Sequence, residues 1–288
     1  MREYVKIPGG QYSIGTDAMD GFPKDKEGPK ITIELPSYFI QTTTVTNENF
    51  QEFIRETGFI TEAEKFGWSY VFHYFLSEED KIKAPKVPGL NWWFAVEGAD
   101  WQHPEGPNST IIDRMDHPVV HVSRNDCLAY CKWEGSRLPT EAEWEVAAKG
   151  RTESERYPWG PELLKDNDWQ CNIWQGNFPL DNTLEDGFSH TAPVKTYEPN
   201  GYGLYQVIGN IWEWCLNPQG IELAEFHSKK SSDFFSLHST YDSGAFAIRG
   251  GSFLCHESYC KRYRIAARNG NTGDSSSNNM GFRTVKDY

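Results

Sequence analysis

Apolar and polar residues alternate in the N-terminal part of the chain. Residues 4–6 and 11–15 alternate on either side of Gly9–Gly10, which predicts two short strands joined by a glycine turn. Ile31–Leu35 alternates in the same way, and Thr42–Val45 continues the β-rich character. We therefore expect this part of the chain to be mainly β-structure.

The first helix is predicted where the spacing of apolar residues changes from every second position to every third or fourth. Phe50, Phe53 and Ile54 fall at helical spacing, Thr46 can cap the N-terminus, and Gly58 can end the helix.

Two further helices are predicted before residue 151. One covers about residues 125–134 and stops at Gly135. The other begins with the capping box Thr140–Glu143 and buries Trp144. Residues 60–115 are aromatic and proline-containing and allow no confident assignment, and helix signals nearly vanish after residue 151. With no repeat and no linker, residues 1–288 read as one domain.

Composition narrows the class of protein. Only 38% of the 288 residues are hydrophobic, aromatics make up 15%, and 25 Gly with 16 Pro indicate a loop-rich globule. The net charge of −13 disfavours binding to nucleic acids and to anionic membranes. No run of 18 apolar residues and no signal-peptide pattern is present, so we expect a cytoplasmic protein.

Six cysteines are present. An even number could form three disulfides, but without an export signal free thiols or a metal site are favoured. The six are Cys127, Cys131, Cys171, Cys215, Cys255 and Cys260.

The segment from Arg249 to Arg264 carries the strongest local chemistry. Within it, Cys255 and Cys260 are five positions apart, which would turn their side chains about 140° from each other on a helix. On a loop that bends after Gly250-Gly251 the two sulfurs could converge. Converging thiols could form a disulfide, bind a soft metal or have no relationship. Zinc and iron–sulfur clusters usually need four protein ligands, whereas copper(I) can be held by two thiolates.

The surroundings of these cysteines resemble the active-site signature of the formylglycine-generating enzymes, also called sulfatase-modifying factors. The resemblance extends in order over nearly the whole chain and is carried by short motifs. They are Arg137–Glu145, Asn172–Gly176, Glu185–Phe188, Asn200–Tyr205, Gly209–Trp214 and Asn271–Arg283.

The resemblance implies a compact α+β fold related to C-type lectins, with little regular secondary structure. It implies a copper-dependent, O2-using oxidase that converts a peptidyl cysteine to formylglycine. The substrate would be an unfolded sulfatase-type polypeptide bearing Cys-x-Pro-x-Arg. Cys255 and Cys260 would bind copper(I), Ser252 and Tyr259 would lie beside the sulfurs, and Trp212 would form a pocket wall. His256 is not expected to be a ligand.

Two calcium sites are implied by the same resemblance, and both mix carboxylate, amide and main-chain oxygens, the ligands that calcium prefers. The first would use Asn172, Ile173, Asp186 and Phe188. The second would use Gln206, Gly209, Ile211 and Glu213, with Gln206 where the family commonly has Asn. The alternative for each set is hydrogen bonding within loops.

Some positions depart from the family pattern. Exported relatives have disulfide partners near Ile265 and Thr284, which are not cysteines here, and Cys131 would be left unpaired, in keeping with a reducing compartment. Arg124 stands where Trp is usual.

Two other functions stay open: an oxidase of this fold acting on another peptide or small thiol, and a binding protein without catalysis. Inactive relatives lose the cysteine pair that this chain retains.

Overall fold

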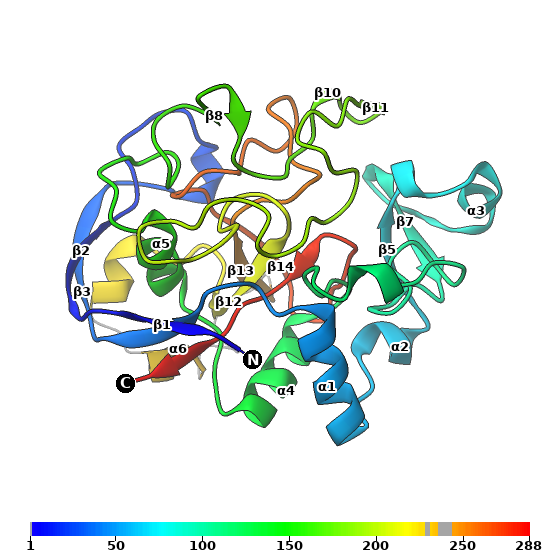
Figure 1. Ribbon diagram of the computed structural model, residues 1–288, viewed down its shortest axis with the longest axis horizontal. Coiled ribbons are helices and arrows are strands. Elements are labelled where there is room, and N and C mark those ends of the chain that lie inside the picture. The colour runs from blue at the N-terminus through cyan, green and yellow to red at the C-terminus, as the bar shows by residue number, and fades with distance from the viewer. Residues whose placement is uncertain (1, 228–230, 236–243) are drawn as a thin grey trace.

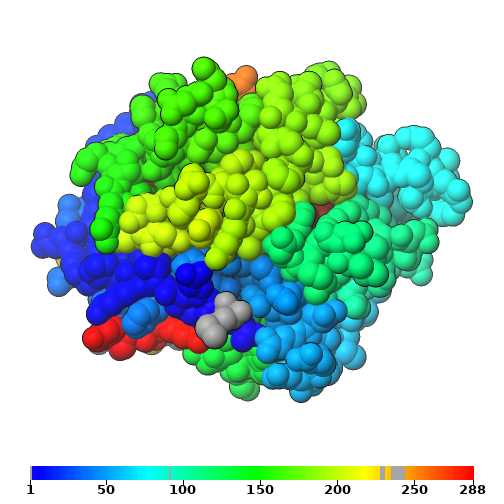
Figure 2. Space-filling model, viewed as in Figure 1, coloured from blue at the N-terminus to red at the C-terminus, as the bar shows by residue number. Residues whose placement is uncertain are grey.

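The computed structural model describes residues 2–227, 231–235 and 244–288. It has an α+β fold in which short helices surround several small sheets (Figure 1). One sheet, in the order β1-β4-β16, joins the two ends of the chain. Its strands are β1 (Tyr4–Ile7), β4 (Tyr38–Gln41) and β16 (Val285–Asp287). Figure 2 shows the first and last segments side by side on one face of the molecule.

The N-terminal prediction is confirmed in part. Strands β1, β2 (Gly10–Ile14) and β3 (Ile31–Leu35) form where alternation predicts them. The expectation of β-structure at Thr42–Val45 is wrong, because the strand ends at Gln41. Beyond it, the backbone bonds to separate partners: Thr42 N donates to Glu3 O and Val45 N to Phe282 O, both at 2.9 Å.

The three predicted helices are present with the predicted ends. Helix α1 (Asn47–Thr57) is capped by Thr46, and α4 (Arg124–Glu134) ends at Gly135. Helix α5 (Glu141–Lys149) begins with the capping box of Thr140 and Glu143. The remaining helices are short: α2 (Glu62–Phe66), α3 (Glu78–Lys83), α6 (Ser231–Phe235), and the 3-10 turns η1 (Pro23–Asp25), η2 (His73–Phe75), η3 (Ile112–Arg114) and η4 (Leu223–His227).

A four-stranded sheet, in the order β14-β13-β12-β15, lies at the centre of the C-terminal half. Its longest strand, β12, is buried along its whole length, so the sheet is covered on both faces. Its members are β12 (Trp212–Pro218), β13 (Ala245–Arg249), β14 (Asn269–Thr272) and β15 (Met280–Gly281). Two small hairpins precede it: β8 (Leu164–Lys165) with β9 (Asp168–Trp169), and β10 (Gly176–Asn177) with β11 (Asp181–Asn182).

A lobe beside the main body comes from the region that the sequence left unassigned. It contains the sheet β5-β7-β6, with strands β5 (Trp68–Phe72), β6 (Lys86–Val87) and β7 (Leu90–Glu97). In Figure 1 it projects to the side of the molecule, with α3 at its end. The lobe has a small apolar cluster of its own, which includes Val71 and Phe94. Its inner face forms one wall of the pocket described below.

Buried ion pairs hold the loops of the main body together. Glu213 and Arg283 are both nearly inaccessible, and their side chains pair through two contacts of 2.6 and 2.7 Å. Arg249 and Arg268 both reach Glu141 in the same interior. These pairs join segments far apart in the sequence. No helix among the described residues has the length and apolar character that crossing a membrane would require.

Candidate active site

Two glycines bring the cysteine segment into the interior. After β13, Gly250 and Gly251 have φ values of +96° and +77°, which side chains other than glycine rarely adopt. A Cβ on Gly250 would lie 2.9 Å from Val207 O, so space also requires glycine there. The chain then makes two tight turns, with Cys255 N bonded to Ser252 O and Cys260 N to His256 O, both at 2.8 Å.

These turns bring the two cysteine side chains together. The sulfurs of Cys255 and Cys260 lie 2.7 Å apart, both residues are buried, and both are free cysteines. Burial raises the pKa of Cys255, which keeps its proton and donates it toward Cys260. That donation, assisted by the nearby Arg262, lowers the pKa of Cys260. Cys260 is therefore the thiol of the pair that ionises first.

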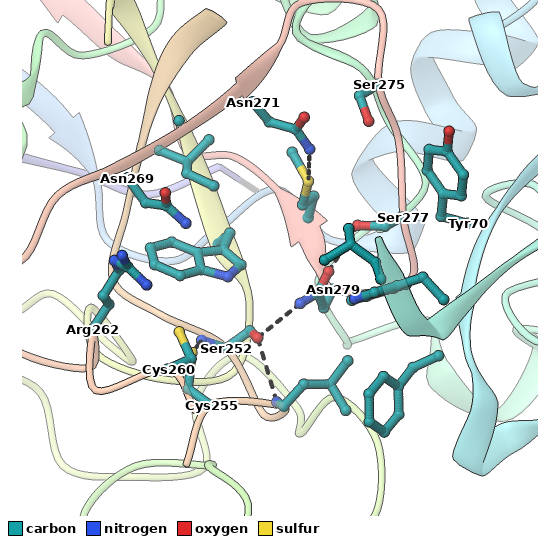
Figure 3. Close-up of a pocket in the computed structure, with 18 of the residues that line it drawn as sticks. Tyr70, Ser252, Cys255, Cys260, Arg262, Asn269, Asn271, Ser275, Ser277 and Asn279 are labelled. Atoms are coloured by element: carbon teal, nitrogen blue, oxygen red, sulfur yellow. Dashed lines mark hydrogen bonds between the residues drawn. The ribbon is translucent and has the colours of Figure 1, made fainter. Parts of the chain in front are cut away.

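The cysteine pair lies in a pocket of about 450 Å³ (Figure 3). Trp212 of β12 and Ile248 of β13 contribute one wall, and Tyr70 and Trp93 of the side lobe contribute another. Loops complete the pocket with serine and asparagine side chains. The pocket therefore has an apolar part, made of aromatic and aliphatic side chains, and a polar part, and it lies between the central sheet and the lobe.

Ser252 is tied to both the sulfurs and the polar wall. Its N–H donates to the Cys255 sulfur at 3.4 Å, and its hydroxyl accepts from Asn279 Nδ2 at 2.9 Å. Ser277 in turn donates to Asn279 Oδ1 at 2.7 Å (Figure 3). This chain of hydrogen bonds fixes the hydroxyl at the base of the pocket.

Tyr259, predicted to lie beside the sulfurs, and Trp212, predicted as a pocket wall, both line the pocket. Tyr259 is 37% exposed, and its ring stacks on Phe178 at 4.8 Å and meets the edge of Trp92 at 4.6 Å. His256 is not one of the residues that line the pocket, and its Nδ1 lies 2.8 Å from the hydroxyl of Ser258. All five residues predicted as catalytic therefore line this one pocket.

The structure adds pocket residues that the sequence reasoning missed. Arg262 is the one charged side chain among the described residues that line the pocket, and its Nε and Nη2 lie 2.5 and 3.1 Å from Asp25. Asn269, Asn271 and Asn279 supply amides. Arg262 lies inside the cysteine motif, but its partner Asp25 is 237 residues away, and no local pattern signals that contact.

The donor set at the cysteine pair suits copper(I). Among the described residues no group of three or more His, Cys, Asp or Glu side chains could hold a metal, so a four-ligand zinc or iron–sulfur site is not formed by them. Two thiolates suffice for copper(I). The two sulfurs would have to move apart to hold a metal ion between them. They now lie 2.7 Å from each other, whereas a single metal–sulfur bond, taking zinc as the guide, is already about 2.3 Å long.

The first predicted calcium set fits a cation. Asp186 accepts from the N–H groups of Ile173 and Phe188, both at 3.0 Å, and burial raises the pKa of its carboxyl group. Asn172 Oδ1 is buried, and none of the described residues bonds it. The amide nitrogen of Gln175 bonds both Ile173 O and Asp186. Rotation of that amide would present its oxygen to the same place.

The second predicted calcium set does not fit a divalent cation. Gln206 Oε1 is buried and has no partner in the part of the chain that the structure describes, as expected of a ligand atom. The only carboxylate, Glu213, is bound at both oxygens by Arg283, and Trp144 Nε1 donates to it at 2.8 Å. Arg283 already neutralises this carboxylate, so Gly209 and Ile211 could add only uncharged main-chain oxygens.

The chain is similar to known proteins over nearly its whole length. The family model described as "Sulfatase-modifying factor enzyme 1-like domain" matches residues 1–288. A protein of Thermomonospora curvata named formylglycine-generating enzyme is 49% identical over 98% of this chain and 93% of its own. A Bos taurus protein named inactive C-alpha-formylglycine-generating enzyme 2 is 42% identical over 97% and 86%. The solved structure of PvdO from Pseudomonas aeruginosa shares the fold, with a TM-score of 0.70, 19% identity, and coverage of 100% and 95%.

Proposed function

The chain belongs to the sulfatase-modifying factor enzyme 1-like family, and from this premise we propose that it converts a peptidyl cysteine to formylglycine. The reaction would use O2 and copper(I), which makes the protein an oxidoreductase acting on a sulfur-containing substrate. One observation carries the proposal: two free, buried thiols meet at the base of an open pocket. Family membership alone does not decide activity, since one similar protein is named inactive.

The chain's own residues would bind and shield the reacting group. Copper(I), when held by Cys255 and Cys260, supplies one-electron chemistry toward O2. Ser252 keeps the Cys255 sulfur in place through its N–H, and Asn279 keeps the Ser252 hydroxyl in place. Trp212 is 6% exposed and excludes water from that side of the pocket.

The proposed substrate is an unfolded sulfatase-type polypeptide bearing Cys-x-Pro-x-Arg. The pocket is open, and its volume of about 450 Å³ admits a cysteine with part of the chain beside it. The test is to mix the copper-loaded protein with such a peptide under O2 and to look for the aldehyde by mass spectrometry. A peptide with serine in place of cysteine is the control. Failure to form any aldehyde would refute the proposal.

A second candidate is oxidation of a different peptide or a small thiol at the same sulfurs. The polar wall favours a polypeptide, because three asparagine side chains line the pocket and amides suit peptide groups. The two candidates separate in competition. A small thiol should leave aldehyde formation on the peptide unchanged if the polypeptide is the substrate.

Calcium is expected to stabilise the protein through the Asp186 site. Ligand at 100 times its Kd adds about 2.7 kcal/mol of unfolding free energy. The wild-type melting temperature should rise with calcium and fall with a calcium chelator, whereas Asp186→Asn should respond to neither. An equal calcium response in both proteins would contradict the site.

This stabilisation should depend on pH. Burial raises the pKa of Asp186 in the metal-free folded state, so that state binds a proton at pH values where the unfolded chain has lost it. The metal-free protein therefore loses stability as pH rises through this raised pKa. Calcium binds the ionised carboxylate, so the rise in melting temperature should be larger at neutral than at acidic pH. A calcium response that does not grow toward neutral pH would exclude Asp186 as the titrating ligand.

We further propose a reducing, cytoplasmic location. All six cysteines are free in the structure, and the five outside position 260 have raised pKa values because they are buried. Such thiols persist where disulfides are not formed.

A further inference from the structure

Three asparagine side chains line the polar part of the pocket, and two of them are already engaged. Asn279 bonds Ser252 and Ser277. Asn271 accepts from Thr272 N at 2.9 Å and donates toward the Met280 sulfur at 3.4 Å. Within the described ranges, the amide of Asn269 has no hydrogen-bond partner, although it is half-buried on the same wall.

The position of Asn269 makes its unused amide accessible to a bound molecule. It begins β14 and pairs in register with Ile248, so the central sheet fixes its backbone. Figure 3 shows Asn269 between Asn271 and Arg262, with its amide turned toward the pocket and no dashed line to a neighbour. The amide thus stands on a rigid strand beside the place where a substrate would lie.

The charge around Asn269 favours a neutral partner. Arg262 next to it is paired with Asp25 and also assists the ionisation of Cys260, so its charge is already engaged. No other charged side chain of the described residues lines the pocket. A carboxamide carries one acceptor oxygen and two N–H donors, which match the C=O and N–H of a peptide group.

We propose that Asn269 binds a main-chain peptide group of the substrate next to the cysteine that reaches Cys255 and Cys260. This rests on the proposed function and deepens it. A contact with the main chain does not depend on the side chains of the substrate. It would therefore add affinity for any extended polypeptide. Specificity for a motif would then come from other parts of the pocket.

The test is a double-mutant cycle between Asn269 and single peptide bonds of the ligand. The probe is the Cys-x-Pro-x-Arg peptide with serine in place of cysteine, so that it binds without reacting. In each of a set of analogues, one peptide bond near the serine is replaced by an ester, which removes its N–H. The bond to proline has no N–H and serves as an internal control. Dissociation constants are measured with metal-free protein.

We expect Asn269→Ala to weaken binding of the parent peptide about three- to tenfold, the effect of one net hydrogen bond. One ester analogue should bind the wild type equally weakly, and Asn269→Ala should not weaken that analogue further. Asn125→Ala is the matched control, because this asparagine is exposed outside the pocket with its amide bonded to Glu62, and it should leave both peptide affinity and the ester pattern unchanged.

Each outcome decides between this inference and the proposed function. If Asn269→Ala binds the parent peptide like the wild type, the proposal is wrong. If every ester has the same effect in both proteins, Asn269 does not touch the main chain, which also overturns it. If the wild type converts the cysteine peptide while either result holds, only this inference fails. If the wild type neither binds nor converts a peptide, the proposed function fails with it.

Discussion

Replacing either Cys255 or Cys260 with serine should lower formylglycine formation by about 10³-fold or more, the scale seen when a residue of a catalytic unit is removed. The two sulfurs lie 2.7 Å apart at the base of one pocket, so neither has a substitute nearby. A serine hydroxyl is a hard donor and a poor ligand for copper(I). The double variant should be no worse than either single variant, because the residues act together.

A copper-binding measurement makes this prediction independent of turnover. In competition with a chromophoric copper(I) chelator, the wild type should retain one copper ion, and each serine variant should lose it. Cys131→Ala is the control, since Cys131 is buried elsewhere and burial raises its pKa to about 12. It should keep both copper and activity. Copper retained by Cys255→Ser and Cys260→Ser alike would place the metal elsewhere.

Local signals in the sequence predicted the helix ends but not the side lobe. Thr46, Thr140 and Gly135 each act on the nearest turn, so their effect is readable from neighbours in the chain. The lobe was missed although Thr61 and Glu64 form a capping box before β5, because residues 60–115 also contain several prolines and large aromatics.

The pocket could be predicted only as far as its motif extends. Ser252 to Cys260 is one segment, and a bend after two glycines could be anticipated. Asn269 and Asn279 reach the pocket from β14 and from the loop before β15. Their roles depend on partners outside the cysteine segment, which a single sequence does not reveal. The same reason explains why the second calcium set was predicted although Glu213 is already paired. Its partner Arg283 is 70 residues away in the sequence.

Replacing Arg283 with methionine should lower the free energy of unfolding by about 3–5 kcal/mol. This is the usual loss when one partner of a buried ion pair is removed and the other is left buried without its counter-charge. Arg283 is inaccessible and Glu213 is 1% exposed. Without the guanidinium, the indole N–H of Trp144 would be the only group of the described ranges still bonded to the Glu213 carboxylate. Denaturant unfolding measures the loss. Lys83→Met is the control, because its pair with Glu79 has the same 2.6 Å distance but is exposed, and stability should hardly change.

The double variant Glu213→Leu/Arg283→Met separates a buried-charge effect from a packing effect. Removing both charges should recover much of the stability that Arg283→Met loses, because buried ion pairs are often replaceable by apolar pairs. If the double variant is less stable than Arg283→Met alone, the loss comes from packing rather than from an unpaired charge.

Glu213→Gln also tests the calcium assignment. If calcium binds only at the Asp186 site, the calcium-dependent rise in melting temperature should persist in Glu213→Gln, because Arg283 rather than calcium neutralises Glu213 in the folded protein.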